Sequence, residues 1–190
     1  MTLALRLLAP AIAVALFWTG LANAWLAILA YHAQILLWSR GRLPALRRSR
    51  RRRLLLLVLP AAMAGPILYA LLPEITRAGL LPWLESHQLG GVSLVLMIPW
   101  FGIVHPVLEQ LHWAPLREET PAAHFCFAGY HLLVLAALLK PEWLIVAFGL
   151  LLAASRLWHW MERESESLSA PILTHIVADL GLIIAAWMRT

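Results

Sequence analysis

Four ionisable side chains within the apolar stretches of this chain stand out: Glu109, His131, His175 and Asp179. Ionisable groups at membrane depth are costly and rare, so each is a candidate for a functional site. A carboxylate and imidazoles held close together can take a proton from water and stabilise an oxyanion. These are two main requirements for hydrolysing an amide. The residue types therefore predict hydrolytic chemistry.

The positions of these residues along the chain predict that they lie at a similar depth. Glu109 precedes Arg117 by eight residues, His131 is about ten residues into the next apolar stretch, and His175 is five to six into the last. A helix rises about 1.5 Å per residue, which gives depths of roughly 12, 15 and 8 Å from one side. Asp179 follows His175 by one turn and lies on the same helix face.

The composition identifies the environment in which these residues must be positioned. Of the 190 residues, 62% are hydrophobic and only 13% are charged, whereas soluble domains carry about 25% charged residues. A span needs roughly 20 apolar residues, and the apolar stretches lack the alternation of a membrane barrel. The chain is therefore predicted to be a single membrane domain over residues 1–190, an all-α polytopic transmembrane bundle of about six spans.

The apolar stretches set the expected spans, which are 7–38, 54–72, 92–113, 122–139, 143–160 and 170–187. We expect the first to be one long tilted helix, because it is too long for an upright span. A hairpin is the alternative, and it would move the N-terminus to the other side of the membrane. The start also imitates a signal peptide, but cleavage would leave too few apolar residues before Arg40. Residues 74–88 are expected to lie at the membrane interface.

Eight of the fourteen arginines lie between Arg40 and Arg53, between two apolar stretches. The positive-inside rule places such a segment in the cytoplasm, so we expect an integral protein of the plasma membrane with the lipid bilayer as a partner. A net charge of +5 could suggest nucleic-acid binding in a soluble protein. Because no aromatic residues interleave these arginines, we predict no nucleic-acid partner.

Two motifs in the second half of the chain resemble those of a known family. Phe127 and His131 have the spacing FxxxH, and His175 and Asp179 have the spacing HxxxD. In order and on membrane helices, they are similar to motifs of the CAAX prenyl protease and bacteriocin-processing (CPBP or Abi) family of intramembrane proteases. The resemblance covers residues 92–190, which would form the catalytic core, and it implies a bacterial inner-membrane location.

The family's first motif, EExxxR, is altered in this chain. Glu109 matches its first glutamate, but Gln110 replaces the second and Ala114 replaces the arginine. Loss of a glutamate and an arginine together keeps the buried charge balanced, whereas loss of one would strand its partner. Arg117, one turn beyond Ala114, is a candidate replacement for the missing cation, unless Pro115 ends the helix first.

The resemblance implies a function and assigns roles to the candidate residues. It implies an endopeptidase without a cofactor that cleaves a membrane-anchored peptide or protein, lipidated or not. Glu109 and His131 would activate the attacking water, while His175 and Asp179 would hold the oxyanion or orient the water. Two more residues, Gln110 and Phe127, would support the site.

Two other interpretations remain open at this point. The altered first motif favours a family member without protease activity, acting as an immunity factor or a membrane scaffold. A zinc or iron site is the less favoured alternative, because Glu109 and His112 form one Glu-x-x-His pair where di-iron bundles need two. Metal analysis of the purified protein distinguishes this alternative from metal-free hydrolysis.

Overall fold

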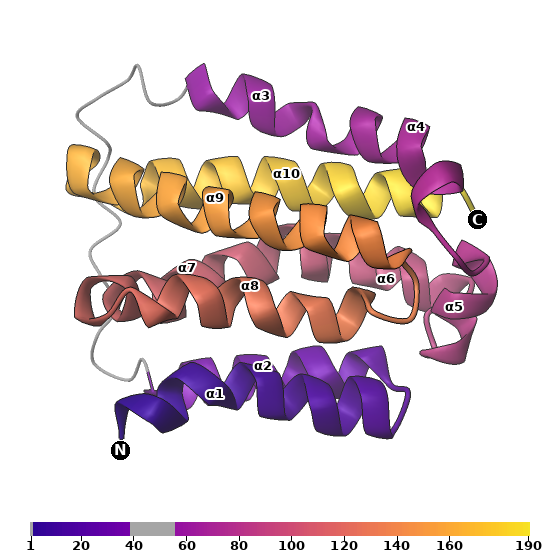
Figure 1. Cartoon of the computed structure of the whole chain (residues 1–190), viewed down its shortest axis with the longest axis horizontal. Helices are drawn as coiled ribbons and strands as arrows, with labels where there is room; N and C mark the ends of the chain where they lie inside the picture. The colour runs from indigo at the N-terminus through magenta and orange to yellow at the C-terminus, as the bar shows by residue number, and fades with distance from the viewer. Residues whose placement is uncertain (1, 39–55) are drawn as a thin grey trace.

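The computed structural model describes residues 2–38 and 56–190 as a bundle of helices (Figure 1). The segment from Arg40 to Arg53, predicted to be cytoplasmic, lies outside the described residues. In chain order the helices are α1 Leu3–Ala13, the π-helical η1 Val14–Gly20, α2 Ala24–Trp38, α3 Val58–Ala62, α4 Ala64–Ile75, α5 Leu80–Ser86, α6 Val92–Pro99, the π-helical η3 Trp100–Val104, α7 His105–Glu119, α8 Ala122–Leu135, α9 Pro141–Ser165 and α10 Ser169–Trp187.

Several helical segments are long and apolar enough to cross a membrane. In the described part of the chain five qualify, namely Leu3–Gly20, Val58–Ile75, Val92–Glu119, Pro141–Ser165 and Ser169–Trp187. Ala24–Trp38 and Ala122–Leu135 are shorter apolar helices. Large apolar side chains such as Ile145 and Leu150 are exposed on the outside of the bundle, as lipid contact requires. The prediction of an all-α transmembrane bundle is confirmed, and the chain is a membrane protein.

The first apolar stretch is a helical hairpin, so the prediction of one long tilted helix is wrong. The chain reverses after Gly20, where Ala22 adopts a positive φ of 47°. The Asn23 side chain then caps α2 by accepting a hydrogen bond from the Leu26 amide at 2.9 Å. The start of α1 and the end of α2 consequently lie at the same end of the bundle (Figure 1).

The third span is longer than predicted, because α6, η3 and α7 form one helical segment from Val92 to Glu119. The π-helical turn η3 follows Pro99, which cannot donate an intrahelical hydrogen bond. Helix α7 then continues past Pro115, so Arg117 lies within a helix although the predicted span 92–113 stops before it. This extension brings the arginine back towards the candidate site.

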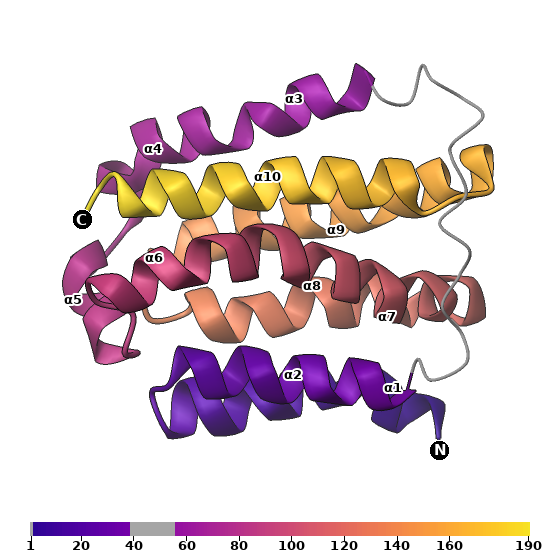
Figure 2. The ribbon, with the colours of Figure 1, turned by 180° about the vertical axis from the view of Figure 1, so that it is seen from behind.

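Helix α10 lies at the centre of the bundle, between α4 on one side and α7 and α9 on the other (Figures 1 and 2). Its contact with α4 is close because glycines meet there. A Cβ atom on Gly65 would lie 2.7 Å from the Gly181 carbonyl oxygen. The central position of α10 places His175 and Asp179 inside the protein, where both are buried.

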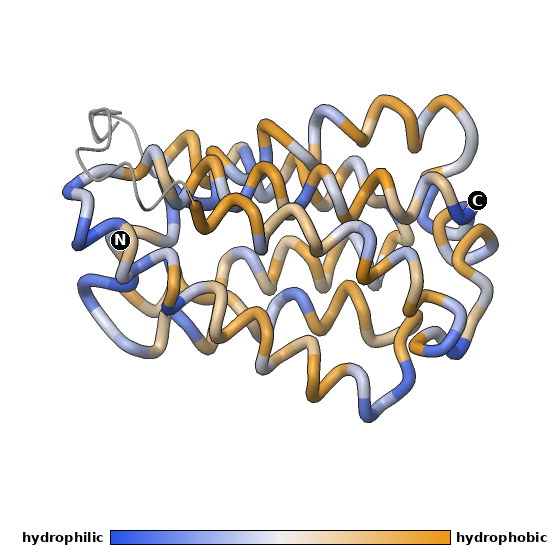
Figure 3. The backbone as a smooth tube through the Cα atoms, turned by 90° about the horizontal axis from the view of Figure 1, so that it is seen from above, coloured by the Kyte–Doolittle hydropathy of each residue, from blue (hydrophilic) through white to orange (hydrophobic). Residues whose placement is uncertain are grey.

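Helix α5 covers the end of the bundle opposite the N-terminus (Figure 2). Leu84 is buried there, and the Trp83 ring lies 5.3 Å from that of Trp18. The most hydrophilic stretches gather at the two ends of the bundle, with apolar stretches between them (Figure 3). This distribution is the one expected of a protein whose middle is surrounded by lipid.

Candidate active site

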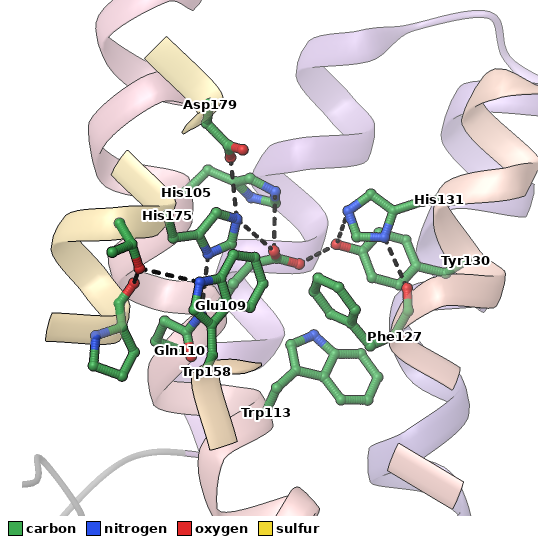
Figure 4. A network of polar contacts seen from close by, with 12 residues as sticks. His105, Glu109, Gln110, Trp113, Phe127, Tyr130, His131, Trp158, His175 and Asp179 are labelled. Atoms are coloured by element: carbon green, nitrogen blue, oxygen red, sulfur yellow. Dashed lines mark hydrogen bonds and ion pairs between the residues drawn. The ribbon is translucent and has the colours of Figure 1, made fainter. Parts of the chain in front are cut away.

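The four predicted residues belong to one polar network inside the bundle (Figure 4). Glu109 of α7 is 1% exposed, and its Oε2 lies 3.6 Å from Nε2 of His175 on α10. The same Nε2 lies 3.3 Å from Oδ2 of Asp179, one turn further along α10. His131 of α8 joins the network through Tyr130 rather than by direct contact with Glu109.

One carboxylate oxygen of Glu109 is held by two phenols. Tyr31 of α2 donates a hydrogen bond to Oε1 at 2.9 Å, and Tyr130 of α8 donates to the same oxygen. The Trp113 indole donates to the Tyr31 hydroxyl at 2.7 Å. Because an indole N–H can only donate, the proton of Tyr31 is directed to Glu109. Neither tyrosine was predicted from the sequence, because Tyr130 occupies an unspecified position of FxxxH and Tyr31 lies outside the recognised motifs.

The His131 ring is held by the backbone through Nδ1, and its Nε2 lies beside Tyr130. Nδ1 lies 2.7 Å from the Phe127 carbonyl oxygen, and Nε2 lies 3.1 Å from the Tyr130 hydroxyl. A carbonyl only accepts, so Nδ1 carries a proton and Nε2 of the neutral ring presents its lone pair to Tyr130. The FxxxH spacing places the two side chains one turn apart, and the Phe127 ring packs against the His131 ring with centroids 4.7 Å apart. Tyr130 stands between the carboxylate and this imidazole.

The Gln110 side chain forms hydrogen bonds with both Arg117 and His175. Arg117 Nη2 donates to Gln110 Oε1 at 2.6 Å, and Gln110 Nε2 lies 3.1 Å from His175 Nδ1. Since Oε1 is the acceptor for arginine, the amide N–H2 must donate to Nδ1 of His175. The neutral His175 ring therefore carries its proton on Nε2, which faces Glu109 and Asp179.

Arg117 supplies a cation near the altered motif, in which Ala114 stands at the position of the expected arginine. Its side chain is 0% exposed, and its Nη2 lies 4.0 Å from Oε2 of Glu162 on α9. Seven residues separate Arg117 from Gln110, which places both on one face of α7. The candidate replacement cation named from the sequence is thus brought onto the altered motif, because α7 does not end at Pro115.

Aromatic rings pack around the polar groups and hold their orientation. The Trp158 ring stacks on His175 with centroids 4.1 Å apart, and its edge meets Phe127 at 5.7 Å. Trp113, which is fully buried, packs against Phe127 and Tyr130. These contacts fix the imidazole and the phenol in a low-dielectric environment, in which hydrogen bonds and charges interact strongly.

The second carboxylate oxygen of Glu109 has different surroundings from the first. Oε2 is buried and has no hydrogen-bond partner among the described residues. It faces two imidazole nitrogens, Nε2 of His105 and Nε2 of His175, each at 3.6 Å. These distances are slightly longer than a direct hydrogen bond. A buried carboxylate oxygen beside two imidazoles can act as a general base.

His112, one member of the Glu-x-x-His pair considered for a metal, contacts a backbone carbonyl. His112 Nε2 lies 3.2 Å from the Arg6 carbonyl oxygen. Within the described residues, no group of three or more His, Cys, Asp and Glu side chains could hold a metal ion. The zinc alternative remains a prediction that metal analysis of the protein tests.

Comparisons of this chain with protein-family models, with curated proteins and with solved structures found no match. The function of this chain is therefore inferred from the chemistry of the cluster around Glu109.

Proposed function

We propose that this membrane protein is an intramembrane endopeptidase similar to the CAAX prenyl protease-like family. It hydrolyses a peptide bond of a membrane-anchored peptide or protein, with water activated by Glu109. The observation that carries the proposal is the asymmetry of this carboxylate. Two phenols hold Oε1, whereas Oε2 is buried without a hydrogen bond and faces two imidazoles.

The reaction begins when Glu109 Oε2 takes a proton from water. The water oxygen attacks the scissile carbonyl carbon, and the carbonyl π electrons move to oxygen and form an oxyanion. His175 Nε2–H, already directed to this side by Gln110, donates to that oxyanion. When the intermediate collapses, the C–N bond breaks and the proton held by Glu109 passes to the leaving nitrogen. The products are a new carboxyl end and a new amine.

His131 contributes to proton transfer from the water through Tyr130. While Glu109 is ionised, Tyr130 donates its proton to Oε1. Once the carboxyl is protonated, its need for that hydrogen bond falls, and Tyr130 can donate instead to the lone pair on His131 Nε2, 3.1 Å away. His131 thereby stabilises the protonated carboxyl that forms during catalysis. Asp179, next to His175 Nε2, orients that ring.

The surroundings of the cluster support entry of the substrate from the membrane. Its residues lie on helices whose outer faces carry exposed apolar side chains, so the substrate enters from the bilayer or from the membrane surface. We place the protein in the inner membrane of a bacterium, with the segment from Arg40 to Arg53 in the cytoplasm. The substrate is anchored in the same membrane, lipidated or not.

The alternative is a family member without protease activity, working as an immunity factor or scaffold. Its main support is the altered first motif, where Gln110 and Ala114 replace a glutamate and an arginine. The bond from Arg117 to Gln110 weakens that support, because a guanidinium still reaches the motif. An inert scaffold also has no need for an unpaired carboxylate oxygen between two imidazoles.

Peptide cleavage in liposomes tests the proposal. The purified protein is reconstituted with a library of membrane-anchored peptides, and new peptide ends are found by mass spectrometry. Glu109→Gln keeps the side-chain shape but removes the base, and we expect it to lower the rate by about 10²–10⁴-fold. Glu142→Gln, at an exposed position at the start of α9, is the matched control and should cleave normally.

Three results would count against the proposal. The scaffold alternative is favoured if neither protein cleaves any peptide of the library. Equal rates for the wild type and Glu109→Gln would remove the glutamate from the mechanism. Stoichiometric zinc or iron that is lost when His131 is changed would favour the metal alternative.

A further inference from the structure

Two hydrogen-bonded imidazoles lie next to Glu109, and the mechanism above gives them no role. His32 of α2 and His105 of α7 are both buried, and Nε2 of His32 lies 3.0 Å from Nδ1 of His105. The other nitrogen of His105, Nε2, lies 3.6 Å from Glu109 Oε2. Trp100 packs beside His32, and Phe101 stacks on His105 with ring centroids 5.2 Å apart. Packing and hydrogen bonding thus hold both rings.

The carboxylate decides which histidine donates in this pair. A hydrogen bond between two neutral imidazoles needs one N–H and one lone pair. If His105 donated from Nδ1, the lone pair on its Nε2 would face the negative Oε2 of Glu109. If His32 donates instead, His105 carries its proton on Nε2 and directs it to that oxygen. The second arrangement is favoured, since it replaces a repulsion with an attraction.

The surroundings of His32 Nδ1 agree with donation from His32 Nε2 to His105. His32 Nδ1 is buried and has no hydrogen-bond partner among the described residues. When His32 donates from Nε2, its Nδ1 is a lone pair, so no N–H is left buried without an acceptor. The two rings therefore form a directed chain of donors from α2 to α7 and on to the carboxylate.

We propose that His105 is a catalytic residue and that His32 is a positioning residue that acts through it. The proposal rests on the endopeptidase function proposed above. Nε2–H groups of His105 and His175 flank Oε2 of Glu109 at equal distances of 3.6 Å. When Oε2 takes the proton of water, its charge moves to the oxyanion, and both donors are then free to bind that oxyanion. The pair forms a two-donor oxyanion hole.

This assignment makes the N-terminal hairpin part of the site. Helix α2 supplies His32 to His105 and Tyr31 to Glu109, across 73 and 78 residues of sequence. The segment 92–190, expected from the resemblance to be the catalytic core, therefore lacks two side chains of the network. Experiments on the site need the full chain.

Two substitutions at His32 test its positioning role in the full-length protein in liposomes. His32→Gln retains an N–H at about the reach of imidazole Nε2, whereas His32→Leu removes the donor. We expect His32→Leu to lower kcat by about 10–100-fold with little change in KM, somewhat less than loss of a direct oxyanion donor. His32→Gln should stay within about threefold of the wild type. His124→Leu, which removes a buried imidazole bonded to Ser155, controls for the general loss of a buried histidine.

A spectroscopic measurement tests the donor arrangement without relying on cleavage. In protein with ¹⁵N-labelled histidine, the His105 signal should show a protonated Nε2 and a bare Nδ1, and His32→Leu should mix the two tautomers. A protonated Nδ1 in the wild type would overturn the proposal. So would normal kcat in His32→Leu while Glu109→Gln is inactive, and that result would leave the endopeptidase function standing. If the wild type itself does not cleave, that function fails, and the tautomer of His105 decides the arrangement alone.

Discussion

Replacing Tyr130 with phenylalanine, and comparing the result with the same change at Tyr31, should distinguish the roles of the two phenols that hold Glu109. Both tyrosines donate to Oε1, but only Tyr130 also contacts Nε2 of His131, at 3.1 Å. Tyr130→Phe therefore removes a hydrogen bond to the carboxylate and disconnects His131. Tyr31→Phe also removes a hydrogen bond to the carboxylate, but it leaves the contact between Tyr130 and His131 intact. It leaves the Trp113 N–H without its acceptor.

The expected magnitudes follow from these contacts. A hydrogen bond to a charged group contributes about 1.5–3 kcal/mol, which is a factor of roughly 10–150 in rate if all of it acts in the transition state. We expect Tyr31→Phe to lower kcat by about tenfold and to reduce stability, because an unpaired buried donor costs about 1–3 kcal/mol. Tyr130→Phe should lower kcat by about 10²–10³-fold, since proton-transfer assistance is lost as well.

A double-mutant cycle measures whether His131 works through Tyr130. Cleavage rates are compared for Tyr130→Phe, His131→Ala and the double variant, with thermal unfolding as a check on folding. If the histidine acts through the phenol, the double variant should be no slower than the slower single variant. Additive losses, or equal effects of Tyr31→Phe and Tyr130→Phe, would refute this reasoning.

Three further substitutions have definite expected outcomes. Gly65→Ala should lower the melting temperature, because its Cβ would lie 2.7 Å from the Gly181 carbonyl oxygen, while Gly129→Ala, with nothing within 4 Å, should not. Arg117→Met should destabilise the protein by about 1.5–3 kcal/mol, since it removes a charged donor from buried Gln110; an unchanged unfolding free energy would contradict this role. Asp179→Asn should keep cleavage within about tenfold, because an amide oxygen still accepts from His175; complete inactivity would mean that the charge is required.

The sequence was informative where local geometry decides the outcome. Membrane insertion requires long apolar helices, and a fixed rise per residue relates chain position to depth. These two facts were enough to predict the bundle, and the residues expected at a common depth, Glu109, His131 and His175, belong to one network inside it. The contact between His175 and Asp179, at 3.3 Å, follows from their separation by one helical turn.

Tertiary packing decides the features that were missed. Tyr31 and His32 reach the cluster only because the first apolar stretch folds back as a hairpin, and hydropathy alone does not distinguish a hairpin from one tilted helix. Whether α7 continues past Pro115 depends on its neighbours, so the position of Arg117 was open. Tyr130 precedes His131 in the chain, but its role depends on a carboxylate from another helix.

The central claim is that Glu109 activates a water that attacks the peptide carbonyl directly. A single turnover in H₂¹⁸O, followed by mass spectrometry of both the product and the protein, tests it. The account predicts one ¹⁸O atom in the new carboxyl end of the peptide and none in the Glu109 side chain. An unlabelled product with ¹⁸O in Glu109 would instead mean attack by the carboxylate itself and would contradict the account.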